Sequence, residues 1–126
     1  MKLPKELRYT ESHEWIADNG DGTVTVGITA VATEQLGDLV YVELPQPGAR
    51  VSRGANCAVV ESTKAAAEVY APVTGEIVAA NAELGAAPEK VNEDAFAAWM
   101  FRIKPANPAD LDKLLDATAY EKSASA

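Results

Sequence analysis

Short β-forming segments separated by glycine and proline turns run through most of this chain, and this pattern constrains its fold most strongly. Residues 23–28 alternate with a period of two, which is typical of a half-buried strand, and they follow the turn sequence Asn19-Gly20-Asp21-Gly22. Residues 13–17, before that turn, can pair with them as a hairpin. Further strands are expected in five segments, at 39–44, 56–61, 67–70, 76–80 and 99–104. The sequence therefore predicts a mostly β protein.

Helices are expected only at the edges of this pattern. Residues 30–36 have the composition of a short helix, and Gly37 ends it. Residues 88–98 are expected to form a loop with a short helix. Residues 109–115 follow a proline-containing break and have helical spacing, with an apolar stripe of Leu111, Leu114 and Leu115. The small, polar tail 121–126 is expected to be disordered.

Two stretches share the order strand, proline, glycine, strand. One covers 40–51 and the other covers 69–77. This pattern indicates a quasi-duplicated β-sandwich or flattened barrel, with Lys64 between its halves. The length of 126 residues suits one domain, 1–126, with an ordered core at about 7–120.

Charge and composition exclude several classes of function. The formal net charge is −8, and nucleic-acid binding needs clustered lysine and arginine, so we expect no DNA or RNA partner. One cysteine, Cys57, allows no internal disulfide and is expected to pack as a small buried residue. With one histidine, His13, no common zinc site can form. No apolar run could span a bilayer and no signal segment is evident, so we expect a cytoplasmic protein, or a matrix-type equivalent if an import peptide has been removed. We also expect a monomer.

Ser12-His13-Glu14 places a nucleophile, a base and an acid next to one another. In an extended strand, successive side chains point to opposite faces, so Ser12 and Glu14 would share one face. His13 would lie on the other face, in the core beside Trp15. A catalytic triad needs its three groups in mutual hydrogen-bond reach, and this pattern therefore argues against a small hydrolase.

Lys64 lies in a run of small residues between two expected strands. If this run is the tip of a hairpin, the lysine is exposed and has no bulky neighbours. Most isolated surface lysines are only solvated, so this position does not identify a function by itself.

The segments on either side of Lys64 are more distinctive, and they read Val59-Val60-Glu61-Ser62-Thr63-Lys64-Ala65-Ala66 and Tyr70-Ala71-Pro72-Val73-Thr74-Gly75-Glu76-Ile77. Together they resemble the lipoyl-lysine hairpin of the glycine cleavage H-protein family. Further motifs of that family follow the same order along the chain: Ser12-His13-Glu14-Trp15, Val26-Gly27-Ile28-Thr29, Leu36-Gly37-Asp38-Leu39-Val40, Val42-Glu43-Leu44-Pro45, Val91-Asn92-Glu93-Asp94, Ile103-Lys104-Pro105 and Leu114-Leu115-Asp116-Ala117-Thr118-Ala119-Tyr120. The resemblance extends from Leu7 to Tyr120.

This resemblance implies a lipoyl-type β-sandwich with short peripheral helices and a C-terminal helix. It implies that lipoic acid is joined to the Lys64 amine, and that the chain is a carrier without catalytic activity of its own. The implied partners are a glycine decarboxylase, an aminomethyltransferase, a dihydrolipoamide dehydrogenase and the enzymes that attach lipoate. The lipoyl group would carry aminomethyl cargo between the first two and electrons to the third.

The resemblance also implies a surface cleft that receives the loaded arm. Ser12 and Glu14 match family positions associated with that cleft, and Gln35 and Glu68 lie where polar family residues face the arm. The cargo amine is cationic, so a carboxylate such as that of Glu14 would stabilise it.

The sequence departs from the family pattern in places. Residues 94–99 contain no glycine and are one residue shorter than usual, Ala67 replaces a commonly polar residue, and Thr63 replaces a commonly aliphatic one. The alternatives are a lipoyl domain of a 2-oxoacid dehydrogenase, which typically has aspartate before the lysine, and an H-like lipoyl relay. A biotin carrier is disfavoured because no methionine flanks Lys64.

Overall fold

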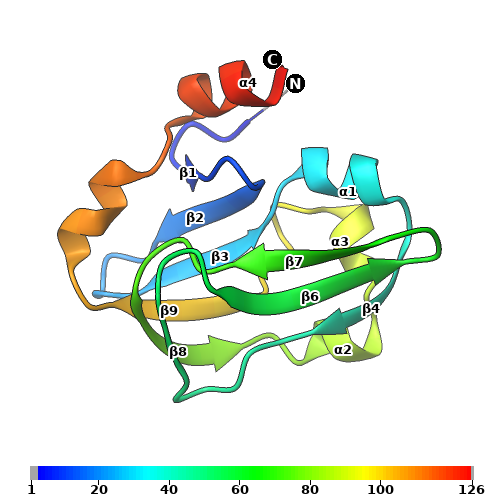
Figure 1. Cartoon of the computed structure of the whole chain (residues 1–126), viewed down its shortest axis with the longest axis horizontal. Coiled ribbons are helices and arrows are strands. Elements are labelled where there is room, and N and C mark those ends of the chain that lie inside the picture. The colour runs from blue at the N-terminus through cyan, green and yellow to red at the C-terminus, as the bar shows by residue number, and fades with distance from the viewer. Residues whose placement is uncertain (1–2, 126) are drawn as a thin grey trace.

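The computed structural model describes residues 3–125 as two antiparallel β-sheets with short helices around them (Figure 1). The larger sheet contains, in spatial order, β1 (Arg8–Tyr9), β2 (Glu14–Asp18), β3 (Val24–Ile28), β9 (Phe101–Pro105), β8 (Gly75–Ala80) and β5 (Arg50–Val51). The smaller sheet contains β4 (Leu39–Glu43), β6 (Asn56–Ser62) and β7 (Ala66–Tyr70). The expected mostly β sandwich is confirmed.

The helices are short and lie at the periphery. They are α1 (Ala30–Leu36), α2 (Glu83–Ala86), α3 (Lys90–Glu93), the 3₁₀ helix η1 (Pro108–Lys113) and α4 (Ala117–Ser125). The prediction for α1 is confirmed at both ends, because the Thr29 side chain accepts from the N–H of Ala32 and Gly37 follows the last residue. None of the helices within residues 3–125 is long and apolar enough to cross a membrane.

The predicted hairpin at the start of the chain forms from β2 and β3. Asp18 pairs with Val24 across the glycine turn, and the strand begins at Glu14, one residue later than expected. The prediction that β3 is half-buried is wrong, because all five of its residues are buried. Its second face is covered as well: Gly27 lies against the Trp15 indole, and Thr25 accepts a hydrogen bond from Arg102 at 3.3 Å.

The main core lies between the two sheets. Alternate residues of the facing strands fill it, as the period-two pattern requires. Its fully buried members include Ile16, Val26, Val60, Val69, Ile77, Phe101 and Ile103. This packing fixes β6 and β7 over the larger sheet and thereby places the hairpin between them at one end of the molecule (Figure 1).

A second, aromatic cluster joins the two ends of the chain. Tyr9, Trp15 and Tyr120 are all buried there, and the Tyr9 and Tyr120 rings stack with centroids 4.8 Å apart. Tyr120 belongs to α4, which lies beside β1 in Figure 1. Residues 121–125, where a disordered tail was expected, continue this helix, and Ala126 lies outside the described residues. Packing of Tyr120 stabilises a nine-residue helix that would be too short to be stable by itself.

The helix expected at 109–115 is also different in the structure. The segment is the 3₁₀ helix η1, and its first turn is capped by the Asn107 side chain, which accepts from the N–H of Ala109 at 3.1 Å. Leu114 and Leu115 lie beyond it in extended backbone. Leu115 exchanges two backbone hydrogen bonds of 2.8 Å with Tyr9, and this pairing ends the helical segment early.

Candidate functional site

Lys64 lies at the tip of the β6–β7 hairpin, in a turn closed by Ser62. The N–H of Ser62 donates to the carbonyl of Ala65 at 2.7 Å, and the Ser62 hydroxyl donates to the same carbonyl at 3.2 Å. That hydroxyl accepts the N–H groups of Lys64 and Ala65 at 3.3 and 3.1 Å. These local bonds hold the backbone of Lys64, while its side chain is exposed as expected.

The stem of Lys64 lies over Gly37, the residue after α1. A Cβ on Gly37 would stand 3.5 Å from Lys64 Cε and 4.0 Å from Nζ. Gly37 has a φ of 84° and a ψ of −159°, a region that essentially only glycine occupies. The Asn92 side chain donates to the Gly37 carbonyl and accepts from the N–H of Leu39, both at 2.9 Å. Asn92, a residue of α3, therefore fixes the backbone at Gly37, over which the lysine side chain lies.

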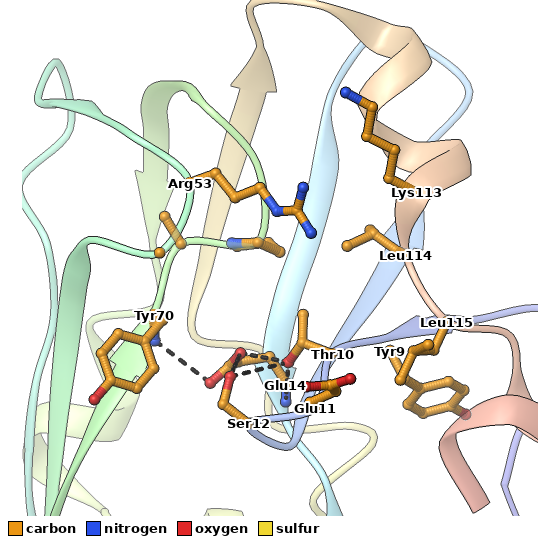
Figure 2. A pocket seen from close by; sticks show the side chains of 13 residues that line it. Tyr9, Thr10, Glu11, Ser12, Glu14, Arg53, Tyr70, Lys113, Leu114 and Leu115 are labelled. Carbon is orange, nitrogen blue, oxygen red and sulfur yellow. Dashed lines mark hydrogen bonds between the residues drawn. The ribbon is translucent and has the colours of Figure 1, made fainter. Parts of the chain in front are cut away.

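A cleft of about 500 Å³ opens near the other end of β7, and we call it the Glu14 cleft (Figure 2). Its walls come from the β1–β2 loop, the turn before β6, the residues after β7 and the end of η1. Side chains that line it include Ser12, Glu14, Arg53, Tyr70, Lys113 and Leu114. Figure 2 shows carboxylates on one side of the cleft and the Arg53 and Lys113 cations on the other.

Glu14 is 1% exposed, although it carries a carboxylate. Its Oε1 accepts hydrogen bonds from the hydroxyls of Thr10 at 2.5 Å and Ser12 at 2.6 Å, and its Oε2 accepts from the N–H of Tyr70 at 3.4 Å (Figure 2). Burial raises the pKa of the Glu14 carboxyl above its usual value, and these three donors oppose the rise. The cleft thus contains a desolvated carboxylate that is satisfied by uncharged donors.

The geometry of Ser12 and Glu14 differs from the expected strand. Ser12 precedes the strand, and its hydroxyl reaches Glu14 across the β1–β2 loop, not along a shared strand face. The loop turns at His13, whose φ is 72°. His13 is half-buried against Tyr120, with Nδ1 2.7 Å from the Tyr120 hydroxyl, which corrects the expected core position beside Trp15.

Neither Gln35 nor Glu68 lines the Glu14 cleft. Gln35 is exposed on α1. Glu68 is exposed on β7, where it accepts a hydrogen bond from the Tyr70 hydroxyl at 3.1 Å. The structure brings Ser12 and Glu14 together and places Glu68 on the strand that connects the Lys64 turn with the cleft.

Sequence reasoning misses three groups of this site: the Thr10 hydroxyl, the Tyr70 N–H and Arg53. Thr10 reaches the carboxylate only because the backbone turns back at His13, and no strand periodicity predicts that turn. Tyr70 and Arg53 reach the cleft through tertiary packing of the smaller sheet, for which the sequence carries no local signal.

Cys57 lies at an irregularity in the register of β6, between Asn56 and Ala58. It is half-buried, where full burial was expected. Burial raises the pKa of its thiol to about 12, and the charge of Glu14 adds to the rise. The thiol is therefore protonated at neutral pH.

A family model for the glycine cleavage H-protein matches residues 7–126. The chain belongs to this family. It is 61% identical to the glycine cleavage system H protein of Nitrosospira multiformis over 122 residues, which cover 97% of this chain and 95% of that protein. It is 58% identical to the H protein of Thiobacillus denitrificans with the same coverage.

The fold is similar to a crystal structure of a glycine cleavage system H protein from Mycobacterium marinum. The TM-score is 0.88 at 39% sequence identity, and the match covers 98% of this chain and all of that one. The family resemblance and the lipoyl-type β-sandwich expected from the sequence are both confirmed.

Proposed function

We propose that this chain is the lipoyl carrier of a glycine cleavage system, with lipoic acid joined by an amide bond to Nζ of Lys64. The observation that carries the proposal is the Ser62-closed turn in a member of the H-protein family. It presents one exposed lysine among small residues, on a backbone held by its own hydrogen bonds.

The surroundings of Lys64 fit an acylated lysine. Gly37, which has no Cβ, leaves room beside the lysine stem, and the exposed neighbours Ala65 and Ala66 add little bulk. Acylation removes the ammonium charge, so the extended side chain becomes more apolar and can lie against the protein. When attached, the lipoyl group supplies a dithiolane that carries an aminomethyl group or two electrons.

The proposed partners act in sequence. A glycine decarboxylase supplies the aminomethyl cargo, an aminomethyltransferase removes it, and a dihydrolipoamide dehydrogenase restores the disulfide. Lipoate-attaching enzymes prepare the carrier. Because the curated relatives come from bacteria, we place this cycle in the cytoplasm, with the chain as a monomer.

The Glu14 cleft is the proposed resting place of the loaded arm. β7 leads from the lysine turn to Tyr70 at the cleft, and its five residues advance by about 13 Å at a rise of ~3.3 Å each. An arm attached to Lys64 can follow this strand past Glu68. At its end the Glu14 carboxylate would bind the cationic amine, with Ser12 beside it. Gln35 and Glu68 remain predicted contacts of the arm itself.

The arrangement of Ser12 and His13 supports a carrier over a hydrolase. The Ser12 hydroxyl donates to Glu14, and the His13 ring contacts Tyr120, so the serine and the imidazole are each engaged elsewhere. The 2-oxoacid dehydrogenase alternative is disfavoured because H proteins match the chain over nearly its whole length.

The deciding experiment compares Lys64→Arg with Lys104→Arg, a change at another exposed lysine. Each protein is incubated with a lipoate-attaching enzyme, weighed by intact mass spectrometry and assayed for glycine–bicarbonate exchange with the partner enzymes. We expect Lys64→Arg to keep the circular dichroism of the unchanged chain while gaining no lipoyl mass and supporting no exchange. Lys104→Arg should behave as the unchanged chain. A lipoyl increment on Lys64→Arg would overturn the assignment.

A further inference from the structure

The loop that carries Ser12 and Glu14 has a strained backbone at His13. In this loop, residues 10–14, the N–H of His13 donates to the carbonyl of Thr10 at 3.2 Å, and the N–H of Thr10 donates to the carbonyl of Glu14 at 3.0 Å. His13 follows the turn with a φ of 72°. Hairpin loops of this kind usually have glycine in the left-handed position, because a Cβ is strained there. Within residues 3–125, His13 is the only residue other than glycine with a positive φ.

The side chain of His13 has a partner that a glycine could not reach. Its Nδ1 lies 2.7 Å from the hydroxyl of Tyr120, 107 positions later in the sequence, and the two rings meet edge to face. The Tyr120 hydroxyl also lies 2.7 Å from Thr29 Oγ1, and the Thr29 N–H donates to the His13 carbonyl at 3.0 Å. Tyr120 and Thr29 therefore hold the strained residue from its side chain and from its backbone.

Tyr120 itself has a fixed position. Its side chain is fully buried, and its ring stacks on Tyr9 at an interplanar angle of 12°. Tyr9 is the residue immediately before the loop and pairs with Trp15 immediately after Glu14. The ring that carries the hydroxyl facing His13 is thus packed against β1, one of the two strands that the loop connects.

We propose that Tyr120 is a positioning residue of the Glu14 cleft. Through the imidazole of His13, it keeps the 10–14 loop in the conformation in which the Thr10 and Ser12 hydroxyls donate to the Glu14 carboxylate. Tyr120 belongs to helix α4, whose residues do not line the cleft. This helix thereby controls the hydrogen bonding of the Glu14 carboxylate in the cleft. The significance of this role rests on the proposed function, in which Glu14 binds the cargo amine.

The test measures the Glu14 carboxyl directly, by ¹³C NMR pH titration of the chain without an arm. Tyr120→Phe keeps the ring stack and removes the hydroxyl. We expect it to release the loop and raise the pKa of Glu14 by about one unit, because losing one hydrogen bond to the charged form changes proton affinity roughly tenfold. The matched control is Tyr9→Phe, which removes a phenol hydroxyl from the same stack, one that donates to the Pro4 carbonyl at 2.7 Å. It should leave the pKa of Glu14 unchanged.

Replacement of His13 separates positioning from general stability. Glycine adopts the left-handed conformation without an anchor, so in a His13→Gly background the Tyr120→Phe change should no longer move the pKa of Glu14. A merely structural role of Tyr120 would lower the melting temperature in both backgrounds and leave this pKa alone. That outcome, or an equal shift in both backgrounds, would overturn the proposal.

Should Tyr120→Phe fold poorly, His13→Ala and His13→Gly answer the same question without a change in α4. Alanine lacks both the anchor and the conformational freedom, so it should raise the pKa of Glu14, whereas glycine should not. Equal values in the two variants would contradict the proposal. Because every measurement uses the chain without lipoate, its result is independent of whether Lys64 carries an arm or Glu14 binds its cargo.

Discussion

The indole of Trp15 lies directly against Gly27 on the paired strand, so that a Cβ on Gly27 would stand 2.5 Å from the ring atoms Cε2 and Cζ2. The indole is held there by its Nε1–H, which donates to the carbonyl of Ala95 at 2.9 Å. The absence of a side chain at Gly27 is therefore what allows Trp15 to reach the loop at 94–99.

We predict that Gly27→Ala displaces the Trp15 indole and lowers the free energy of unfolding by about 1–3 kcal/mol, the usual effect of overpacking a buried site. Urea denaturation gives the free energy, and the indole N–H resonance of Trp15 reports loss of the bond to Ala95. An unchanged resonance with unchanged stability would show that the strand pair can widen at no cost.

Gly37→Ala should destabilise the protein for a different reason. Its φ of 84° with a ψ of −159° lies in a region where a Cβ costs about 1–3 kcal/mol. Gly85→Ala is the matched control, because a Cβ there meets nothing within 4 Å and alanine favours the helix. In thermal unfolding, Gly37→Ala should melt below the unchanged chain and Gly85→Ala at or slightly above it. Similar melting of the two variants would argue against strain at Gly37.

The strands and α1 could be predicted from the sequence because their signals are local. Alternation and the glycine turn locate β2 and β3, and Thr29 with Gly37 bounds α1. The last turns of α4 could not be predicted, because a helix of nine residues is marginal by itself and this one depends on Tyr120 packing against Tyr9.

The candidate site was predictable to a similar extent. Lys64 and the pair Ser12 and Glu14 follow from motifs. The burial of Glu14 could not be predicted, because it depends on the left-handed turn at His13 and on the N–H of Tyr70, which is distant in the sequence.

The burial of Glu14 predicts how stability depends on pH. Because burial raises the folded pKa of this carboxyl above its ordinary value, the native state binds the proton more tightly than the unfolded state. The stability that this proton contributes is fully present below the unfolded pKa, and it is lost as pH rises through the folded pKa. Glu14→Gln mimics the protonated carboxyl at every pH. The free energy of unfolding of this variant, relative to that of the unchanged chain, should therefore increase as pH rises from the unfolded to the folded pKa of Glu14. Urea unfolding at a series of pH values checks this, and a difference independent of pH would contradict the raised pKa.

In the proposed cycle, the loaded carrier should lose its cargo sooner when Glu14 is neutral. Even where solvent screens the pair, a carboxylate stabilises a nearby ammonium by about 1 kcal/mol, which corresponds to roughly a fivefold change in lifetime. We expect Glu14→Gln to be lipoylated normally but to release ammonia and formaldehyde about fivefold faster in the absence of the transferase. Glu89→Gln, at an exposed carboxylate, is the control. Equal release by the two variants would assign Glu14 no role in holding the cargo.

Cys57 should react slowly with thiol reagents in the folded chain. The rise of its pKa from 9.0 to about 12 lowers the thiolate fraction about a thousandfold near pH 8, and only the thiolate reacts. Alkylation at pH 8 should therefore be far slower in buffer than in denaturing urea. Glu14→Gln removes the smaller cause of the shift and should accelerate the folded reaction. Rapid alkylation of the native chain would show that the thiol is less buried than its position in β6 indicates.

Under the proposed function, the turn around Lys64 also determines when lipoate can be attached. Its hydrogen bonds join Ser62 to the backbone of Lys64 and Ala65, and the lysine ammonium takes part in none of them. The polypeptide can therefore complete its folding with a free lysine, and a newly made molecule would already display the surface for the proposed lipoate-attaching enzyme. Synthesis and modification are thus separable events, and a cell short of lipoate would accumulate folded protein that can be modified later.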